Sequence, residues 1–144
     1  MATVIFFFLQ QKQQAEAEKS SVNYWQMFSG ISLERKYIEE AGAYYRIPVF
    51  SPDLLTHSGK EITLEGYYLP FSPVDSVIIL SRYPNASCFF CGQAGIESVA
   101  MVEMADVETY KTDQRLSVKG KLKLNATDVK RLAFIIVDAS VEER

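Results

Sequence analysis

The chain has 144 residues, of which 48% are hydrophobic and 23% are charged, and its net charge at pH 7 is −3. A chain of this size buries about two-thirds of the surface that its unfolded form exposes, so it can fold as one domain without a metal ion or a disulfide. The acidic balance argues against nucleic-acid binding through bulk charge. The single histidine, His57, argues against multi-histidine metal sites and histidine-based catalytic triads.

The first 21 residues are expected to lie outside the folded domain. Residues 2–9 form an apolar run that is far shorter than the roughly 20 residues needed to span a bilayer. Two interpretations are open. The run is either the remnant of a signal or membrane anchor, followed by a polar linker, or a first apolar element of the domain. We favour the first, because residues 15–17 have the small-x-small pattern of a cleavage site, although a basic leading segment is missing. It predicts a periplasmic protein, or one held peripherally or by an anchor on the exported side of a bacterial membrane, with residues 22–144 as a single domain.

The first part of that domain, residues 22–50, is rich in aromatic side chains and has a mixed pattern. Pro48 and Pro52 prevent any long helix in this region. We expect an irregular arm with short strands that packs on the main body. Ser51 and Pro52 then predict a short helical turn, with Ser51 as the N-cap and Pro52 at the first helical position.

Five later segments have the length and pattern of β-strands. Residues 61–70 and 114–125 alternate between apolar and polar side chains, which is typical of half-buried strands. Asn125 or Thr127 is expected to cap a turn of helix before the last strand. The predicted strands are 61–70, 75–83, 97–106, 114–125 and 133–143.

Two glycines lie inside predicted strands, Gly66 in the first and Gly120 in the fourth. A glycine inside a strand usually marks a bulge, a bend or a close approach of backbones. Small closed barrels need such bends because their strands must coil tightly. The sequence therefore predicts a mainly β fold: a small five-stranded OB-like barrel with an irregular N-terminal arm and a short helix before the last strand. A two-layer antiparallel sandwich of the same strands is the alternative.

Residues 22 to about 105 resemble a known family in the order and spacing of several motifs. The shared features are Trp25, Gly59-Lys60, Gly66-Tyr67, Pro70, a hydrophobic strand that ends in a cysteine-containing loop, and a strand like 97–106. This pattern resembles a family of uncharacterised, mostly exported bacterial proteins, defined as a domain of unknown function. The resemblance implies an OB-like barrel, a periplasmic or envelope location and no established activity. Since some members accompany transporter systems for metals, it also implies envelope transporter components as partners. Better-known branches carry a histidine and a proline-rich run in the loop where this chain has CFFCGQAGIES.

Both cysteines of the chain, Cys88 and Cys91, lie in the predicted loop between the second and third strands. As a metal site they supply only half of a zinc ligand set, which His57, Glu97 or another carboxylate, or a partner chain, would have to complete. Two thiolates alone suit a soft ion such as Cu(I). As a redox pair they could cycle between dithiol and disulfide, although no helix is predicted to follow them. They could also simply stiffen the loop, and the sequence leaves all three interpretations open.

A basic stripe lies on the polar side of the fourth predicted strand. On a barrel, such a stripe could follow the phosphates of an oligonucleotide. The chain is acidic overall and this strand has no aromatic residue, so an ordinary solvated face is the better interpretation. The stripe consists of Arg115, Lys119, Lys121 and Lys123.

No pair of carboxylates, serine–histidine arrangement or glycine-rich phosphate loop emerges from the sequence. We therefore expect a non-enzymatic accessory or binding protein of the bacterial envelope, with a soft or zinc-like metal ion at Cys88 and Cys91 as the only cofactor that the sequence suggests. The alternatives are a thiol-redox or metal-chaperone protein that uses the same pair, and an oligonucleotide-binding module.

Overall fold

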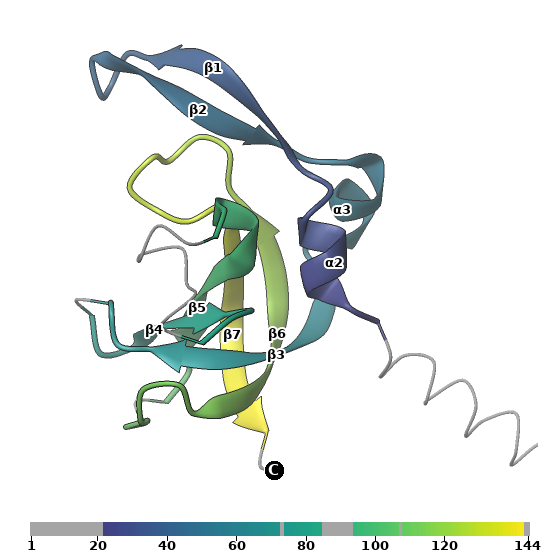
Figure 1. The fold of residues 1–144 in the computed structure, drawn as a ribbon, viewed down its shortest axis with the longest axis vertical. Helices are drawn as coiled ribbons and strands as arrows, with labels where there is room; N and C mark the ends of the chain where they lie inside the picture. The colour runs from purple at the N-terminus through teal and green to yellow at the C-terminus, as the bar shows by residue number, and fades with distance from the viewer. Residues whose placement is uncertain (1–21, 73, 85–93, 107, 143–144) are drawn as a thin grey trace, which may run out of the picture.

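The computed structural model describes residues 22–72, 74–84, 94–106 and 108–142. This part of the chain forms a closed five-stranded barrel from which a two-stranded hairpin projects (Figure 1). Within these ranges no helix has both the length and the apolar character needed to cross a membrane. The predicted N-terminal segment 1–21 and the cysteine loop with Cys88 and Cys91 lie outside the described residues.

The barrel confirms the predicted fold class. Its strand order is β3-β4-β5-β7-β6, and β6 pairs again with β3 to close the barrel. Only the β5–β7 pairing is parallel, and the other pairings are antiparallel. This closed five-strand arrangement is OB-like and excludes the two-layer sandwich. The strands are β3 (Glu61–Leu69), β4 (Val77–Ser81), β5 (Val99–Met104), β6 (Arg115–Leu124) and β7 (Phe134–Glu142).

The core lies inside this barrel and follows the alternation of apolar residues. Along β6, Leu116, Val118 and Leu122 are buried, as their spacing predicts. Ser117, which the alternation places on the outer face, is also buried. The ring of Phe134 on β7 stacks at a centroid distance of 3.9 Å on the ring of Phe28, which comes from outside the barrel.

Gly66 lies where β3 changes partners. β3 pairs with β6 along residues 61–67 and with β4 along residues 67–69. A Cβ atom at Gly66 would lie 2.6 Å from the backbone oxygen of Ser81. β3 bends where it changes from β6 to β4, and it can come this close to β4 only because position 66 has no side chain.

Gly120 lies opposite a bulge in β7. The β6–β7 register shifts between Lys119 and Lys121, where Asp138 adopts a φ of 51°. A Cβ atom at Gly120 would lie 2.7 Å from the backbone oxygen of Val137. Both interior glycines therefore mark close approaches between strands, as the barrel prediction requires.

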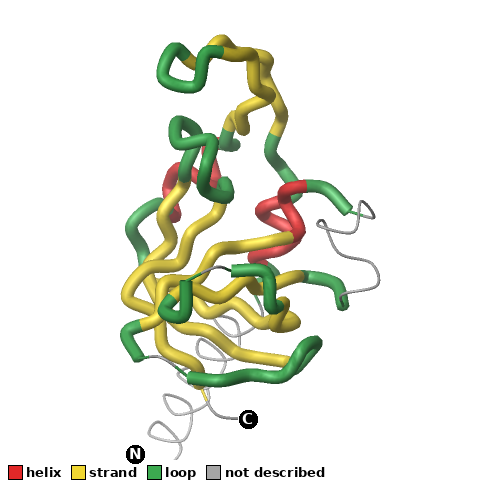
Figure 2. Tube along the Cα trace, turned by 90° about the vertical axis from the view of Figure 1, so that its left-hand side faces the viewer, coloured by secondary structure: helices red, strands yellow, loops and turns green. Residues whose placement is uncertain are grey.

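The N-terminal arm is more regular than predicted. It consists of the helix α2 (Tyr24–Phe28), the antiparallel strands β1 (Ser32–Ile38) and β2 (Ala43–Val49), and the helix α3 (Pro52–His57). Helix α2 packs on the barrel and buries Trp25 and Phe28. The β1–β2 hairpin instead extends beyond one end of the barrel (Figures 1 and 2), so the prediction that the arm packs on the main body holds only for its helical part.

The predicted cap of α3 is confirmed. The Oγ atom of Ser51 accepts a hydrogen bond from the backbone N–H of Leu54 at 3.3 Å, and Pro52 occupies the first turn. Because proline has no N–H to donate, this position costs the helix no hydrogen bond.

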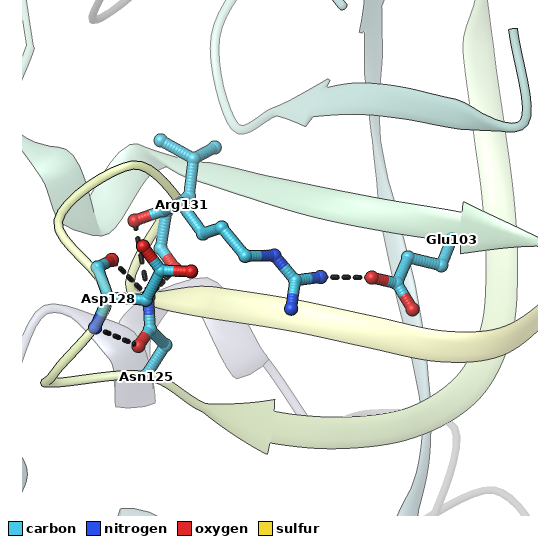
Figure 3. A network of polar contacts seen from close by, with 5 residues as sticks. Glu103, Asn125, Asp128 and Arg131 are labelled. Carbon is cyan, nitrogen blue, oxygen red and sulfur yellow. Dashed lines mark hydrogen bonds and ion pairs between the residues drawn. The ribbon is translucent and has the colours of Figure 1, made fainter. Parts of the chain in front are cut away.

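The prediction of a turn of helix before the last strand is wrong. Residues 125–133 form a loop without a helix, closed by the side chain of Asn125 (Figure 3). Its Nδ2 donates to the backbone oxygens of Asp128, Arg131 and Leu132, at 2.8, 3.2 and 3.1 Å. Its Oδ1 accepts from the N–H groups of Thr127 and Asp128. Asn125 thus binds the nearby backbone N–H groups as expected of a cap. Its buried side-chain amide also donates to three carbonyls, which favours a compact loop over a helix.

Candidate functional site

The hairpin presents one face that combines tyrosine and arginine side chains. Alternate residues of a strand point to the same side, and the register pairs Leu33 with Pro48, Arg35 with Arg46, and Tyr37 with Tyr44. These six residues form one side of the ribbon, which we call the tyrosine–arginine face: Leu33, Arg35, Tyr37, Tyr44, Arg46 and Pro48.

The aromatic part of this face is exposed and internally ordered. Tyr37 and Tyr44 are 49% and 61% exposed. Their rings meet edge to face with centroids 5.2 Å apart. The guanidinium carbon of Arg35 lies 4.3 Å from the centroid of the Tyr44 ring, which is the geometry of a cation–π contact. The three side chains therefore support one another without being covered.

The two arginines of this face place two positive charges side by side. Arg35 and Arg46 are directly opposite each other in the β1–β2 register, and both are exposed. Like charges at such positions destabilise a sheet. A carboxylate from another molecule, placed between the two arginines, would relieve this repulsion. The planar guanidinium groups of the arginines are also donors whose geometry matches a carboxylate.

The base of the hairpin faces one end of the barrel across a cavity. A cavity of about 260 Å³ separates β2 from the loop 125–133 and from the short 3₁₀ helix η3 (Ile96–Ser98), and its apolar lining includes Ile47, Ile96 and Leu132. The loop is fixed in turn by an ion pair between Arg131 and Glu103 on β5 (Figure 3). The side of the cavity that faces the hairpin is therefore held in place by the barrel.

A second candidate surface is a wide groove of about 1020 Å³ beside α2, over β3 and β6. Two members of the predicted basic stripe, Arg115 and Lys119, line this groove, and all four side chains of the stripe are exposed. Two of them pair with carboxylates on β3: Arg115 with Glu65 at 3.6 Å and Lys119 with Glu61 at 3.4 Å. Arg115 also lies over the Tyr67 ring, 4.8 Å from its centroid. These contacts support the solvated, charge-paired strand face over a track for phosphates.

The two additional metal ligands considered from the sequence, His57 and Glu97, lie in α3 and in η3. The Nδ1 atom of His57 lies 2.8 Å from the backbone oxygen of Asp53, and the ring meets the Tyr24 ring edge to face at 6.0 Å. Burial raises the pKa of Tyr24. Glu97 belongs to η3, directly after the cysteine loop. Within the described ranges no group of three or more histidine, cysteine, aspartate or glutamate side chains could hold a metal ion.

The two ends of the cysteine loop are held together, although the loop itself lies outside the described residues. Ser81 pairs with Val99 where β4 and β5 meet. The N–H of Arg82 donates to the backbone oxygen of Ser98 at 2.8 Å. The strands that lead into and out of this loop therefore lie side by side. The expectation that Cys88 and Cys91 lie close together stays a prediction.

Sequence reasoning missed the tyrosine–arginine face. The alternation of Leu33, Arg35 and Tyr37 was available, but the segment mixes polar and apolar residues on both faces because neither face is buried. A strand without a buried face has no clear period-two signal. The one usable sign was the density of tyrosines on either side of the turn at Gly42, where φ is 65°.

Comparison with models of known protein families gives no match. Comparison with curated protein sequences gives no match either.

Proposed function

We propose that this chain is a non-enzymatic binding protein of the bacterial envelope, in which the barrel serves as a platform and the hairpin as the arm that holds a partner protein. The observation that carries this proposal is the exposed tyrosine–arginine face on a projecting hairpin. Tyrosine and arginine are among the residues enriched in protein–protein interfaces and among those that dominate their binding energy.

The energetics of the hairpin support this proposal. A two-stranded ribbon is at best marginally stable in water, because it has too little apolar burial to offset the ordering of its backbone. Here the edge-to-face pair of Tyr37 and Tyr44 and the cation–π contact of Arg35 keep the face ordered before a partner arrives. An ordered surface loses less conformational entropy on binding than a flexible one does.

The charge of the face narrows the kind of partner. Arg35 and Arg46 together favour a protein surface that places a carboxylate between two tyrosine rings. Envelope transporter components, which the family resemblance suggests, are the partners we propose. The envelope location rests on the apolar run at residues 2–9 and on the same resemblance. Mass spectrometry of the N-terminus of protein from its native host, combined with membrane fractionation, tests that location.

The binding role is tested by site-specific photo-crosslinking in the native host. A photo-reactive phenylalanine replaces Tyr44, and the matched control replaces Thr112, an exposed residue in the loop before β6. We expect a product of discrete mass from position 44 only, and we expect Arg46→Glu to abolish it. Mass spectrometry of the product tests whether the partner is a transporter component. Identical products from positions 44 and 112, or no product from either, would overturn the proposed role of the face.

A second candidate function uses the cysteine pair as a thiol-redox or metal-chaperone site. The spacing of the two cysteines favours it, because Cys88 and Cys91 are separated by two residues, as in the Cys-x-x-Cys pairs of redox and metal-binding proteins. Thiol titration combined with metal analysis of the purified protein tests it. A stoichiometric metal ion that is lost in the double variant Cys88→Ser, Cys91→Ser would support the metal site. A stable disulfide without metal would support loop stiffening instead.

A further inference from the structure

The outer edge of β1 is an uncovered strand edge. Among the residues that the structure describes, β1 pairs with β2 and with no other strand. It is the strand of the hairpin farther from the barrel (Figure 1). Its side chains from Ser32 to Tyr37 are all exposed. Such an edge presents a row of backbone donors and acceptors on which another strand can pair.

We propose that this edge binds the same edge of a second copy of the chain, so that two hairpins form one antiparallel four-stranded sheet. The order of charges in β1 favours this pairing, since the strand reads Ser-Leu-Glu-Arg-Lys-Tyr-Ile. In an antiparallel pair centred on Arg35, Glu34 lies opposite the partner's Lys36. The two-fold symmetry produces this ion pair twice, as it must in an isologous interface.

The same register places apolar side chains opposite each other. Leu33 lies opposite the partner's Tyr37, again twice, and these two are 40% and 49% exposed in the single chain. Charged residues normally protect a free edge from pairing. In β1 their order makes a second copy complementary, and cross-strand pairs of this kind are the unit that stabilises a sheet.

Alternative registers lose this complementarity. Moving the partner by two residues in one direction places Glu34 opposite the partner's Glu34, and in the other direction it places Lys36 opposite the partner's Lys36. A shift of one residue would bring opposite faces of the two ribbons together. The centred register does bring Arg35 opposite the partner's Arg35. This one like-charge pair weakens the centred register, but it stands against the two Glu34–Lys36 pairs and the two Leu33–Tyr37 pairs.

This dimer goes beyond the proposed binding role and does not depend on it. The dimer uses the backbone edge of β1 with lateral contacts of Leu33 and Tyr37, whereas the binding role is tested on β2 at Tyr44 and Arg46. In an antiparallel sheet related by a two-fold axis perpendicular to it, the tyrosine–arginine faces of both copies lie on the same side. The dimer would therefore present a surface twice as wide to a partner.

The test is the oligomeric state of the full chain, purified as its host makes it, measured by sedimentation equilibrium across a concentration series. A single strand ladder buries less surface than the roughly 1,000 Å² of a strong interface, so we expect reversible association at micromolar concentrations. Glu34→Lys and Lys36→Glu should each raise the dissociation constant roughly tenfold or more, because each replaces two attractive pairs by two repulsive ones.

The decisive step is to restore complementarity. An equimolar mixture of the Glu34→Lys and Lys36→Glu chains should form a heterodimer, and the double variant with both changes should associate as the original chain does. Glu40→Lys, which makes the same charge change in the hairpin turn, is the control and should leave association unchanged. A monomeric original chain, or a mixture that stays monomeric while both variants keep the original circular dichroism spectrum, would overturn the proposal. Neither outcome affects the crosslinking test at Tyr44, so the two proposals can fail separately.

Discussion

The indole Nε1 of Trp25 donates a hydrogen bond to the backbone oxygen of Glu65 at 2.6 Å. This bond joins the helix of the arm to β3, one residue before the bend at Gly66. A Cβ atom at Gly66 would lie 3.2 Å from Cζ2 of the same indole. The tryptophan thus covers the bend and ties helix α2 to β3.

Replacing Trp25 by phenylalanine should lower the free energy of unfolding by about 1–3 kcal/mol, because phenylalanine fills much of the space but cannot donate to the Glu65 carbonyl. Urea unfolding followed by circular dichroism measures this, since the variant has no tryptophan for fluorescence. Tyr24→Phe on the same helix is the control and should stay within about 0.5 kcal/mol of the original chain. Equal effects of the two changes would show that the hydrogen bond does not hold the helix in place.

Valine at Gly66 or at Gly120 should destabilise the barrel by about 3 kcal/mol or more, since each new side chain would meet backbone atoms that cannot move aside. Thermal melts by circular dichroism measure both variants. Thr63→Val on β3 and Lys121→Val on β6 are the controls, because both side chains face solvent. A harmful Gly120→Val together with a neutral Gly66→Val would contradict the bend in β3.

Aspartate at position 125 should destabilise the protein more than alanine does. Alanine removes the hydrogen bonds of the Asn125 side chain, at a cost of about 1–3 kcal/mol. Aspartate keeps the accepting oxygen but directs a second oxygen toward the three carbonyls that Nδ2 now contacts. Chemical denaturation of both variants gives the order, and Thr127→Ala is the control because that side chain is exposed. If alanine proved worse than aspartate, the carbonyl cluster would not be the determining contact.

Tyr110 should ionise late in an alkaline titration. Burial, and then the hydrogen bond from its hydroxyl to Glu108 at 2.9 Å, raise its pKa to about 12. The folded state therefore favours the neutral phenol more than the unfolded state does, where the pKa is about 10. The resulting stabilisation is complete below pH 10 and is lost as the pH rises from about 10 to about 12.

Tyr110→Phe should remove one late-ionising group from the ultraviolet titration of the tyrosines and flatten the fall in stability over that pH range. Tyr83→Phe, in which the replaced tyrosine is exposed, is the matched control. A late-ionising group that persists in Tyr110→Phe and disappears in Tyr24→Phe would assign the late ionisation to Tyr24 instead, whose pKa burial also raises.

The parts of the fold that could be predicted are those in which one side of a strand is buried. The alternation around Leu116, Val118 and Leu122 states which side faces the core, and the two interior glycines state where the strands approach closely. The loop after β6 could not be predicted in the same way, because the choice between a helical cap and a closed loop depends on the three carbonyls that Asn125 reaches in space. The hairpin could not be assigned a face because neither of its sides is covered, so its strands carry no burial signal. The proximity of Cys88 and Cys91 stays a prediction, because both residues lie outside the described ranges.

The position of β7 has a consequence for how the molecule is assembled. This strand lies between β5 and β6 and pairs with both, in parallel with one and antiparallel with the other. Until residues 134–142 have been synthesised, β5 and β6 each keep an open edge and the stacking partner of Phe28 is missing. β7 is thus the strand that closes the barrel. Such long-range pairing is slow to form, and an unsealed intermediate exposes apolar edges that favour aggregation. The barrel is therefore most exposed to aggregation in the interval just before β7 inserts.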